Sequence, residues 1–499
     1  MTRRSTLSLA LAAAVVAAPL GAQRPAAAPA PRNIVFILSD DHRYDFMGFH
    51  PGAPSWLETP AMDRMAREGA WVRNAFVSTA LCSPSRASIL TGQYAHRHGI
   101  VDNQRAVPEG TRFYPQYLQA AGYRTAMIGK WHMGIDTTLR PQPGFDHWIE
   151  GRGQGAYSDP LLSIDGRRVQ RTGYTADIVT EYAIEFMDEQ RRAGRPFFVH
   201  LAHKSVHLPF QPAPRHRGRY ASSPVRYPAT MRPDAPGHET WPDWVKAQRS
   251  SWHGVDYMFH GALHYDTFYR QYAETLLGLD ESIGRVLEWL TRTGLDSSTI
   301  VVYMGDNGFS FGEHGLIDKR HAFEESMRVP MLVWAPGLVG AGTQVPQMVQ
   351  NVDVMPTLLE LAGARAPSDH VVDGVSVLAA LRGESVRTRD ALLYEYYWEW
   401  NYPHTPAQFA IRTDRHKYVY HYGIWDRDML FDLRADPVEA FNLAGRAEQR
   451  PLADSLRTRL FEMLASSGGQ SLPLLEPKNE RMDLTRPPGE PSTDPLARP

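Results

Sequence analysis

Short apolar runs that end abruptly in polar residues recur along this chain. The runs are residues 33–38, 125–128, 197–201 and 299–304. Continuous apolar runs of this length are typical of strands covered on both faces, as in a parallel sheet packed between helices. The polar segments that follow them directly are residues 39–41, 129–132, 202–207 and 305–308. Because these segments carry Asp, Asn, Lys, His and Ser, they are candidates for chemistry.

Helical patterns alternate with these runs. Residues 59–68 begin with Thr-Pro and are followed by Gly69, a typical helix start and stop. Residues 175–192 and 268–293 carry apolar side chains at spacings of three and four. The alternation predicts an α/β fold. Ligands of such sheets bind beyond the carboxyl ends of the strands, so we expect the four polar segments to meet in one site.

The character of the chain changes after residue 384. Short runs rich in aromatic residues predict a small antiparallel sheet over residues 392–400, 409–412, 417–422 and 429–433. A helix over residues 446–467 is expected to pack on it. Residues 208–265 show no clear periodicity and predict a long loop that is either functional or partly disordered. The predicted organisation is a catalytic domain over 33–384, an α+β subdomain over 385–480 and a disordered, proline-rich tail over 481–499.

The first 22 residues have the pattern of an export signal. Arg3 and Arg4 precede an apolar stretch over residues 7–20, and Gly21-Ala22 offers a cleavage region. The stretch is short for a transmembrane helix, so we predict a signal peptide over residues 1–22, a flexible leader over 23–32 and a periplasmic or secreted protein. Sec and Tat export both stay open. The formal net charge of −2 provides no overall basic field, so we expect neither a nucleic-acid partner nor a membrane span.

Cys82 is the single cysteine of the chain and therefore makes no disulfide within it. Free cysteines are most often small buried hydrophobes. The neighbours favour another role, because Pro84 suits a first helical turn, residues 87–90 continue the helix and Gly92 suits its end. The N–H groups and dipole of such a helix start attract an anion. Arg86, about one turn further on, adds a planar set of donors.

Asp40, Asp41, Asp306 and Asn307 offer hard oxygen ligands of the kind that Ca²⁺ or Mg²⁺ prefers. An Asp pair after a strand is also typical of a helix cap or a turn. Crowded carboxylates repel one another unless a cation neutralises them. Since these residues follow two separate apolar runs, we favour a shared metal site.

The segment Cys82-Ser83-Pro84-Ser85-Arg86, with Leu90-Thr91-Gly92 behind it, resembles the signature of the type I sulfatases. In that family the cysteine is oxidised by a formylglycine-generating enzyme, and the hydrated aldehyde is the nucleophile. Residues 39–41 and 305–308 are similar to the family's metal-ligand stretches, and calcium is its usual ion. The resemblance implies an alkaline-phosphatase-like large mixed sheet between helices, with a smaller C-terminal antiparallel sheet. It also implies that Cys82, as formylglycine, completes the metal shell.

Lys130 and His132 lie in Gly-Lys-Trp-His-Met-Gly, which matches the next block of the family. The resemblance implies that Lys130 neutralises sulfate charge and that His132 lies against the formylglycine hydroxyls. A surface lysine and a structural histidine are the alternatives. His207 resembles the histidine of the family's Pro-His-x-Pro block, although Val206 stands where proline is common. His203 is a second candidate there, with a structural role as its alternative.

Lys319 matches the last catalytic lysine of the family. The implied mechanism is nucleophilic catalysis in two stages. Arg86, Lys130 and Lys319 would stabilise charge on the sulfate oxygens. His207 or Lys319 would protonate the leaving alcohol, and His132 would then accept a proton from the second hydroxyl of the nucleophile.

Residues 91–103, 143–157 and 394–442 resemble the N-acetylglucosamine-6-sulfatase branch. This implies a sulfated saccharide substrate, with hydrolysis of 6-O-sulfate on N-acetylglucosamine or glucosamine. Trp398 could stack on a sugar, and His404 or Arg412 could bind its hydroxyls; packing in the small sheet is the alternative for each. Cleavage of phosphonate or phosphate esters, and glycan binding without catalysis, are the competing functions.

Overall fold

The computed structural model describes residues 32–133, 140–256 and 264–470. The predicted signal peptide, nearly all of the leader and the tail over 481–499 lie outside these residues. Ten strands form the large sheet: β1 (Asn33–Ser39), β2 (Ala70–Phe76), β3 (Arg124–Gly129), β4 (His147–Gly151), β5 (Leu161–Ile164), β6 (Arg167–Gln170), β7 (Phe197–Ala202), β8 (Thr299–Gly305), β11 (Met331–Trp334) and β12 (Thr343–Gln350). Their spatial order is β12-β2-β11-β8-β1-β7-β3-β4-β5-β6.

The centre of this sheet is parallel. Strands β8, β1, β7, β3 and β4 pair in parallel, whereas β11 is antiparallel to both of its neighbours, and β5 and β6 close one edge as antiparallel strands. The sheet is therefore mixed. Each apolar run predicted from the sequence forms a strand, within a residue or so at either end.

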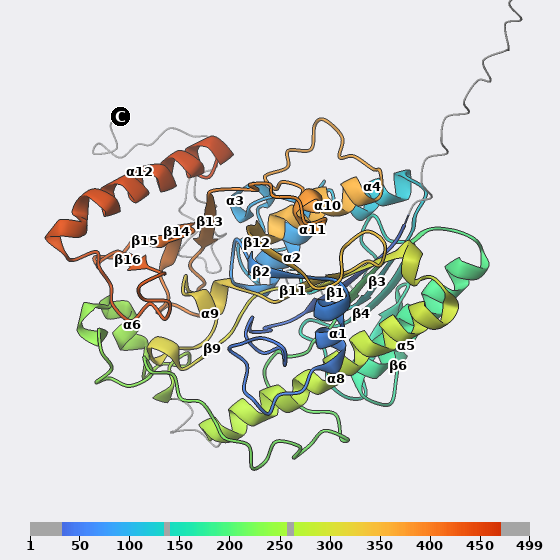
Figure 1. Ribbon diagram of the computed structural model, residues 1–499, viewed down its shortest axis with the longest axis horizontal. Coiled ribbons are helices and arrows are strands. Elements are labelled where there is room, and N and C mark those ends of the chain that lie inside the picture. The colour runs from blue at the N-terminus through green and yellow to red at the C-terminus, as the bar shows by residue number, and fades with distance from the viewer. Residues whose placement is uncertain (1–31, 134–139, 257–263, 471–499) are drawn as a thin grey trace, which may run out of the picture. The chain divides into compact units, whose positions relative to one another are not determined.

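Helices cover both faces of the sheet (Figure 1). One layer contains α1 (Pro60–Glu68), α5 (Thr175–Arg192) and α8 (Tyr265–Thr293), and the other contains α2 (Cys82–Thr91), α4 (Pro115–Ala120) and α10 (Val354–Leu361). Successive side chains of a strand point to opposite faces. In β1, accordingly, Ile34, Phe36 and Leu38 pack against the α2 layer, while Val35 and Ile37 pack against the α8 layer.

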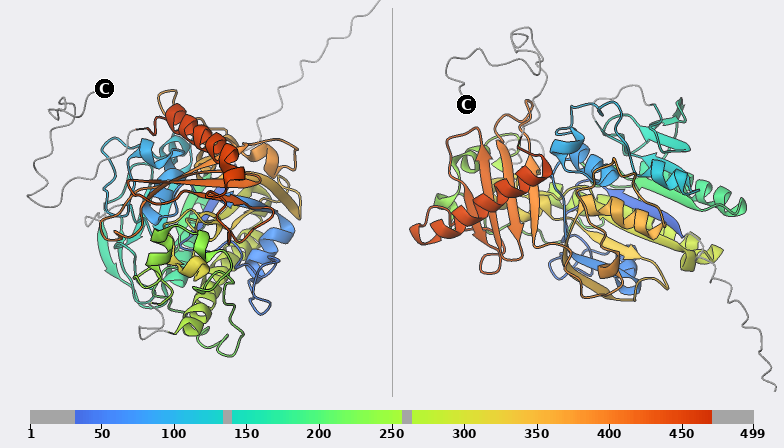
Figure 2. Two further views of the ribbon diagram at one scale, coloured as in Figure 1. Left: turned by 90° about the vertical axis from the view of Figure 1, so that its left-hand side faces the viewer. Right: turned by 90° about the horizontal axis from the view of Figure 1, so that it is seen from above.

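The small C-terminal sheet contains β13 (Ala391–Tyr396), β14 (Ala407–Thr413), β15 (His416–Tyr422) and β16 (Met429–Asp432), all antiparallel. Helix α12 (Arg450–Ser467) lies across it (Figure 2) and buries Leu456, Leu460 and Leu464 against the strands. The predicted closing helix thus starts four residues later than expected. The predicted architecture, a large mixed sheet between helices with a smaller antiparallel sheet, is confirmed.

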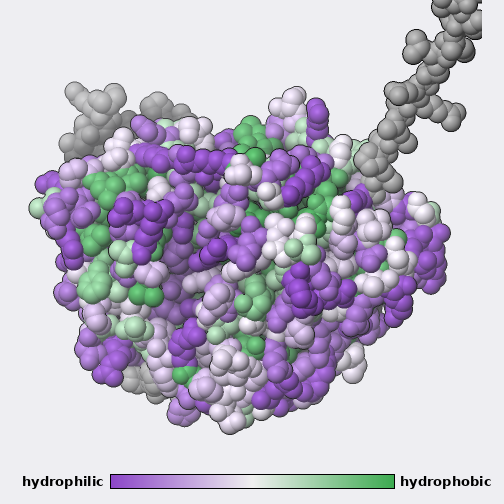
Figure 3. Space-filling model, in the orientation of Figure 1, coloured by the Kyte–Doolittle hydropathy of each residue, from purple (hydrophilic) through white to green (hydrophobic). Residues whose placement is uncertain are grey.

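The remaining elements are short. They are the strands β9 (Ser310–Phe311) and β10 (Ile317–Asp318) and the helices α3 (Ala95–His98), α6 (Asp243–Gln248), α9 (Glu324–Met327) and α11 (Leu378–Leu381). In the predicted loop over 208–265, the described residues form one 3₁₀ turn and α6 before α8 begins. Hydrophilic residues predominate on the face drawn in Figure 3, with apolar residues in scattered patches. Within the described ranges, no helix is both long and apolar enough to cross a lipid bilayer.

Candidate active site

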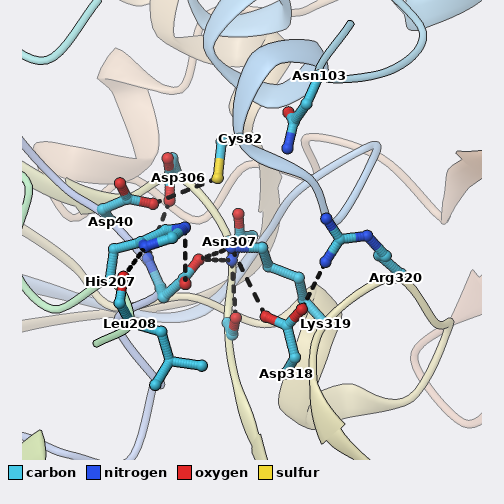
Figure 4. A network of polar contacts seen from close by, with 12 residues as sticks. Asp40, Cys82, Asn103, His207, Leu208, Asp306, Asn307, Asp318, Lys319 and Arg320 are labelled. Carbon is cyan, nitrogen blue, oxygen red and sulfur yellow. Dashed lines mark hydrogen bonds and ion pairs between the residues drawn. The ribbon is translucent and has the colours of Figure 1, made fainter. Parts of the chain in front are cut away.

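The four polar segments meet at the carboxyl ends of the parallel strands, as the strand–helix alternation predicted. Asp40 and Asp41 follow β1, Lys130 follows β3, His207 follows β7, and Asp306 with Asn307 follows β8. Cys82 enters from the first turn of α2. Figure 4 shows Cys82, Asp40, Asp306, Asn307, His207 and Lys319 gathered around one centre.

Helix α2 fixes the position of Cys82. Leu81 is extended, and the helix begins at Cys82 and ends before Gly92, whose φ of 67° is the left-handed conformation that glycine tolerates best. Just after Cys82, the Ser83 N–H donates to Asn103 Oδ1 at 2.9 Å, and the Ser83 hydroxyl donates to the carbonyl of His132 at 2.7 Å. The sequence predicted this helix correctly, but not the part that Asn103 plays in holding it.

The thiol of Cys82 is completely buried and lies 3.4 Å from Asp40 Oδ1. Burial, with the Asp40 carboxylate next in size, raises the pKa of the Cys82 thiol far above its ordinary value. A thiol needs its thiolate form to act as a nucleophile. Burial in this site therefore disfavours the thiolate form of the unmodified cysteine at neutral pH.

Three buried carboxylates, those of Asp40, Asp41 and Asp306, place oxygen atoms within 4.8 Å of one another. The Asp41 N–H donates to Asp306 Oδ1 at 3.1 Å, and Asp41 adopts a φ of 55°. Asp41 Oδ2 and Asn307 Oδ1 are buried and have no hydrogen-bond partner among the described residues. Orphaned oxygens beside crowded carboxylates are the donor set that a hard divalent cation takes.

The carboxylates differ in their electrostatic surroundings. Burial alone would raise the pKa of Asp40, but Lys130 and weaker cations hold it well below its usual value. Burial raises the pKa of Asp41 to about 7 although Lys319 opposes the shift, and burial followed by Asp40 raises the pKa of Asp306. In the absence of a metal, Asp41 and Asp306 therefore resist ionisation, and a bound cation would reverse this.

Three buried cations face the three carboxylates. Lys130 pairs with Asp40, and Lys319 pairs with Asp41. Arg86 donates from Nε to Asp306 Oδ2 at 2.9 Å and from Nη1 to the Lys130 carbonyl at 2.6 Å. Once a metal has brought all three carboxylates into their ionised form, their charges are balanced by those of the three cations. A divalent cation would make the cluster net positive, which suits an anionic substrate.

The histidines of the site are neutral. Burial, with Lys130 next, lowers the pKa of both His132 and His207 well below the ordinary value. His207 Nδ1 bonds to the Leu208 carbonyl, which makes Nδ1 the protonated nitrogen, and a ring nitrogen of His207 lies within 4.8 Å of Asp40 and Cys82. His203 differs, because its Nε2 bonds to Ser282 Oγ at 3.0 Å on α8. Its role is structural.

Gln154 is a site residue to which the sequence assigned no role. Its amide oxygen accepts from the Lys130 ammonium, which has no acceptor, so the amide nitrogen faces His132 Nε2 at 3.1 Å. Gln154 therefore bridges two of the predicted catalytic residues. The Gly153-Gln154-Gly155 segment was only part of a resemblance, and nothing in its spacing indicated this contact.

The predicted sugar-binding residues fall into two groups. Trp398 is 42% exposed and donates its indole N–H to the Pro403 carbonyl at 3.2 Å, and His404 is exposed nearby. Tyr402 in the same loop lies under the Arg320 guanidinium, 3.7 Å from ring to cation, and Arg320 adjoins Lys319. This loop therefore extends from the side of the catalytic cluster into solvent.

Arg412 lies elsewhere. Its guanidinium makes two hydrogen bonds to Glu324 of α9, at 3.1 and 3.2 Å, and lies over the Phe76 ring. The donors that could bind a sugar are thus engaged inside the protein. The structure gives Arg412 a packing role between β14 and α9, which differs from the sugar-binding role that the sequence suggested.

The chain matches two protein families. The sulfatase family matches residues 32–364, and the N-sulphoglucosamine sulphohydrolase C-terminal family matches residues 312–466. An N-acetylglucosamine-6-O-sulfatase of Bacteroides thetaiotaomicron is 34% identical over 473 residues, which cover 83% of each chain. A human N-acetylglucosamine-6-sulfatase is 30% identical over 390 residues, covering 74% of this chain and 67% of that protein.

Solved structures share the fold. One, described as a complex with its substrate D-glucosamine-2-N,6-O-disulfate, has a TM-score of 0.81 and 32% identity, and covers 89% of this chain and 100% of that chain. A phosphonate monoester hydrolase of Agrobacterium radiobacter has a TM-score of 0.71 at 20% identity, over 87% of this chain and 96% of that chain. The second likeness concerns the fold alone.

Proposed function

This chain belongs to the sulfatase family and is a sulfuric ester hydrolase, and we propose that it removes the 6-O-sulfate from N-acetylglucosamine or glucosamine in sulfated glycans. The position of the ester is supported by two relatives named as N-acetylglucosamine-6-sulfatases and by the substrate of the structural relative. The observation that carries the chemistry is the convergence of Asp40, Asp41, Asp306 and Asn307 on Cys82.

We assign the metal to this cluster. Asp40, Asp41, Asp306 and Asn307 would hold it together with modified Cys82, and the two orphaned oxygens on Asp41 and Asn307 fit such a role. Calcium is the proposed ion because every ligand is a hard oxygen, and magnesium is the alternative. When bound, the ion would supply a Lewis acid for the ester and compensate the buried carboxylates.

We propose that Cys82 is converted to formylglycine by a formylglycine-generating enzyme. The raised pKa of the thiol argues that sulfur itself is not the nucleophile. The hydrated aldehyde would supply an oxygen nucleophile and a second hydroxyl at the same carbon.

The other residues position and stabilise the ester. Lys130, Lys319 and Arg86 present fixed positive charge to the sulfate oxygens, which is worth most in a buried site. His132 is neutral, and its Nε2, which faces the amide nitrogen of Gln154, is the ring nitrogen with the lone pair, so we assign His132 the proton of the second hydroxyl. His207 or Lys319 would deliver a proton to the leaving alcohol, since both lie beside Asp41; His207 would first take up a proton at Nε2, because its Nδ1 proton is engaged by the Leu208 carbonyl.

One experiment tests this function. Protein from a host that modifies the cysteine would be assayed against saccharides sulfated at the 6-, 4-, 3- and 2-O positions and at nitrogen, with aryl sulfate and aryl phosphonate alongside. We expect 6-O activity that is lost on chelation and in Cys82→Ala. Mass spectrometry of the peptide with Cys82 reports the modification directly. Activity retained in Cys82→Ala would contradict the assignment of the nucleophile, and dominant phosphonate cleavage would contradict the substrate.

The predicted signal peptide leads us to propose a periplasmic or secreted location. N-terminal sequencing of the mature protein tests this proposal, because cleavage after residue 22 is the expected result.

A further inference from the structure

Lys204 is a buried cation next to the catalytic cluster that the proposed mechanism does not use. It follows β7, three residues before His207, and is 9% exposed. Lys130 and Lys319 are each ion-paired with a carboxylate. In contrast, the Lys204 ammonium makes no hydrogen bond or direct ion pair with the described residues, and it lies over the face of the Tyr157 ring, 5.0 Å from Nζ to the ring centre.

A buried ammonium without a partner is unfavourable for the fold. The Tyr157 ring compensates only in part, because a cation–π contact is weaker than a charge-assisted hydrogen bond. Burial, with the neighbouring Lys130 next, lowers the pKa of Lys204 to about 8. Asp40 and Asp41 act on Lys204 from a distance and oppose this shift, but neither forms a direct ion pair with it. Lys204 therefore remains charged at neutral pH, and an anion placed beside it would stabilise that charge.

The surroundings of Lys204 show where such an anion would lie. Lys204, Lys130, Gln154 and Tyr157 line one recess at the carboxyl ends of β3 and β7. Lys130 reaches from this recess to Asp40, which itself lies beside Cys82. Lys130 is thus shared between this recess and the candidate active site, and both Lys130 and Lys204 line the recess.

We propose that Lys204 is an anion-binding residue that takes an oxygen of a substrate sulfate group in this recess. The inference rests on the proposed function, since it assumes a sulfated substrate. The sulfate is either the ester that is cleaved or a second sulfate on the same sugar. In both cases Lys204 recognises sulfate oxygens beside Lys130.

Two variants separate the charge of Lys204 from its size. Lys204→Met removes the charge and keeps the length, whereas Lys204→Arg keeps the charge. Lys246→Met is a matched control, because Lys246 lies on α6 and pairs with Asp243 at 2.6 Å. Calorimetry with inorganic sulfate on calcium-loaded Cys82→Ala protein measures binding without catalysis. Activity is measured as kcat/KM on glucosamine 6-sulfate and on glucosamine 2,6-disulfate.

If Lys204 holds the ester that is cleaved, Lys204→Met weakens sulfate binding and lowers kcat/KM on both sugars by about 10- to 100-fold, the range for a lost hydrogen bond to a charged group. If Lys204 holds a second sulfate, Lys204→Met lowers kcat/KM on glucosamine 2,6-disulfate and leaves kcat/KM on glucosamine 6-sulfate unchanged. In both cases Lys204→Arg retains most of the affinity, and Lys246→Met is unchanged. Lys204→Met should also melt no lower than the parent protein, because it removes an uncompensated buried charge.

Unchanged sulfate affinity and unchanged kcat/KM on both sugars in Lys204→Met would overturn the proposal. So would a melting temperature that falls by several degrees in both Lys204 variants, since that result identifies a structural lysine. Failure of the proposed function looks different. In that case the parent enzyme is inactive on both sugars, while calorimetry still reports whether sulfate binding depends on Lys204.

Discussion

Replacing Asp41 by asparagine separates what this side chain does for the metal-free fold from what it does for calcium. Asp41 Oδ1 accepts from Asn307 Nδ2 at 2.7 Å and from Lys319, whereas Oδ2 is orphaned. An asparagine keeps the first oxygen and places its NH₂ group at the orphaned position. The variant therefore preserves the internal contacts and removes one proposed metal ligand.

The two effects have opposite signs. A carboxyl whose pKa is raised on folding destabilises the folded state as pH rises above its unfolded value. For Asp41, with a folded pKa of about 7, the metal-free penalty at pH 8 is on the order of 2–4 kcal/mol. The asparagine variant lacks it. Calcium at a hundred times its Kd stabilises the wild type by about 2.7 kcal/mol, and a hundredfold weaker site reduces this to about 0.4 kcal/mol.

Thermal unfolding at pH 8, with EDTA or with calcium, measures both effects. For a chain of this length about 1 kcal/mol corresponds to roughly one degree in Tm. We expect calcium to raise the wild-type Tm by about 3 °C and that of Asp41→Asn by less than about 1 °C. With EDTA, Asp41→Asn should melt as high as the wild type or higher. An equal calcium shift in both proteins, or a variant several degrees less stable in EDTA, would refute the reasoning.

Three further outcomes follow from the same structure. Lys130→Met should lower kcat/KM by on the order of 10²–10³-fold, because it removes a preorganised positive charge at the sulfate. Steady-state kinetics test this, with thermal unfolding as the control for the fold. A loss of kcat/KM below tenfold would argue against charge stabilisation by Lys130. Gln154→Glu keeps the contact with Lys130 but has no N–H group to donate to His132. The new carboxylate should raise the pKa of His132, so kcat should fall and the acidic limb of its pH profile should move to higher pH. An unshifted kcat profile would contradict the proposed contact of Gln154 with both Lys130 and His132. Glu325 is buried, and burial followed by Glu313 raises its pKa to about 8, so the Tm of Glu325→Gln should gain on that of the wild type between about pH 4.5 and pH 8, and the difference should be constant above pH 8. Parallel Tm curves between pH 5 and pH 8 would show that the fold does not raise the pKa of this carboxyl.

The catalytic cluster could be predicted from the sequence because its residues mark the ends of apolar strands. Asp40, Lys130, His207 and Asp306 each stand a few residues beyond such a run, and a parallel sheet brings those ends to one edge. The helix that begins at Cys82 could also be predicted, because Pro84 lies in its first turn and Gly92 follows its last residue.

Residues whose roles depend on distant partners could not be found in this way. Arg412 meets Glu324, 88 positions away, through the docking of the small sheet, and no periodicity encodes that contact. Gln154 lies in a glycine-rich turn that gives no sign of Lys130 or His132. Lys204 lies three positions before His207, and the resemblance that identifies His207 implies no role for this lysine. The strand predicted over 392–400 ends at Tyr396, which leaves Trp398 in a loop.

The complete enclosure of the Cys82 sulfur has a consequence for the proposed maturation of this residue. Groups from residue 40 to residue 319 surround that atom, so the proposed oxidation requires a polypeptide that has not yet folded. Under this proposal, a chain that folds before Cys82 is oxidised keeps a buried thiol that the formylglycine-generating enzyme can no longer reach. The fraction of protein that carries formylglycine should then depend on the rate of Cys82 oxidation relative to the rate of folding. Slower release of the nascent chain should raise that fraction.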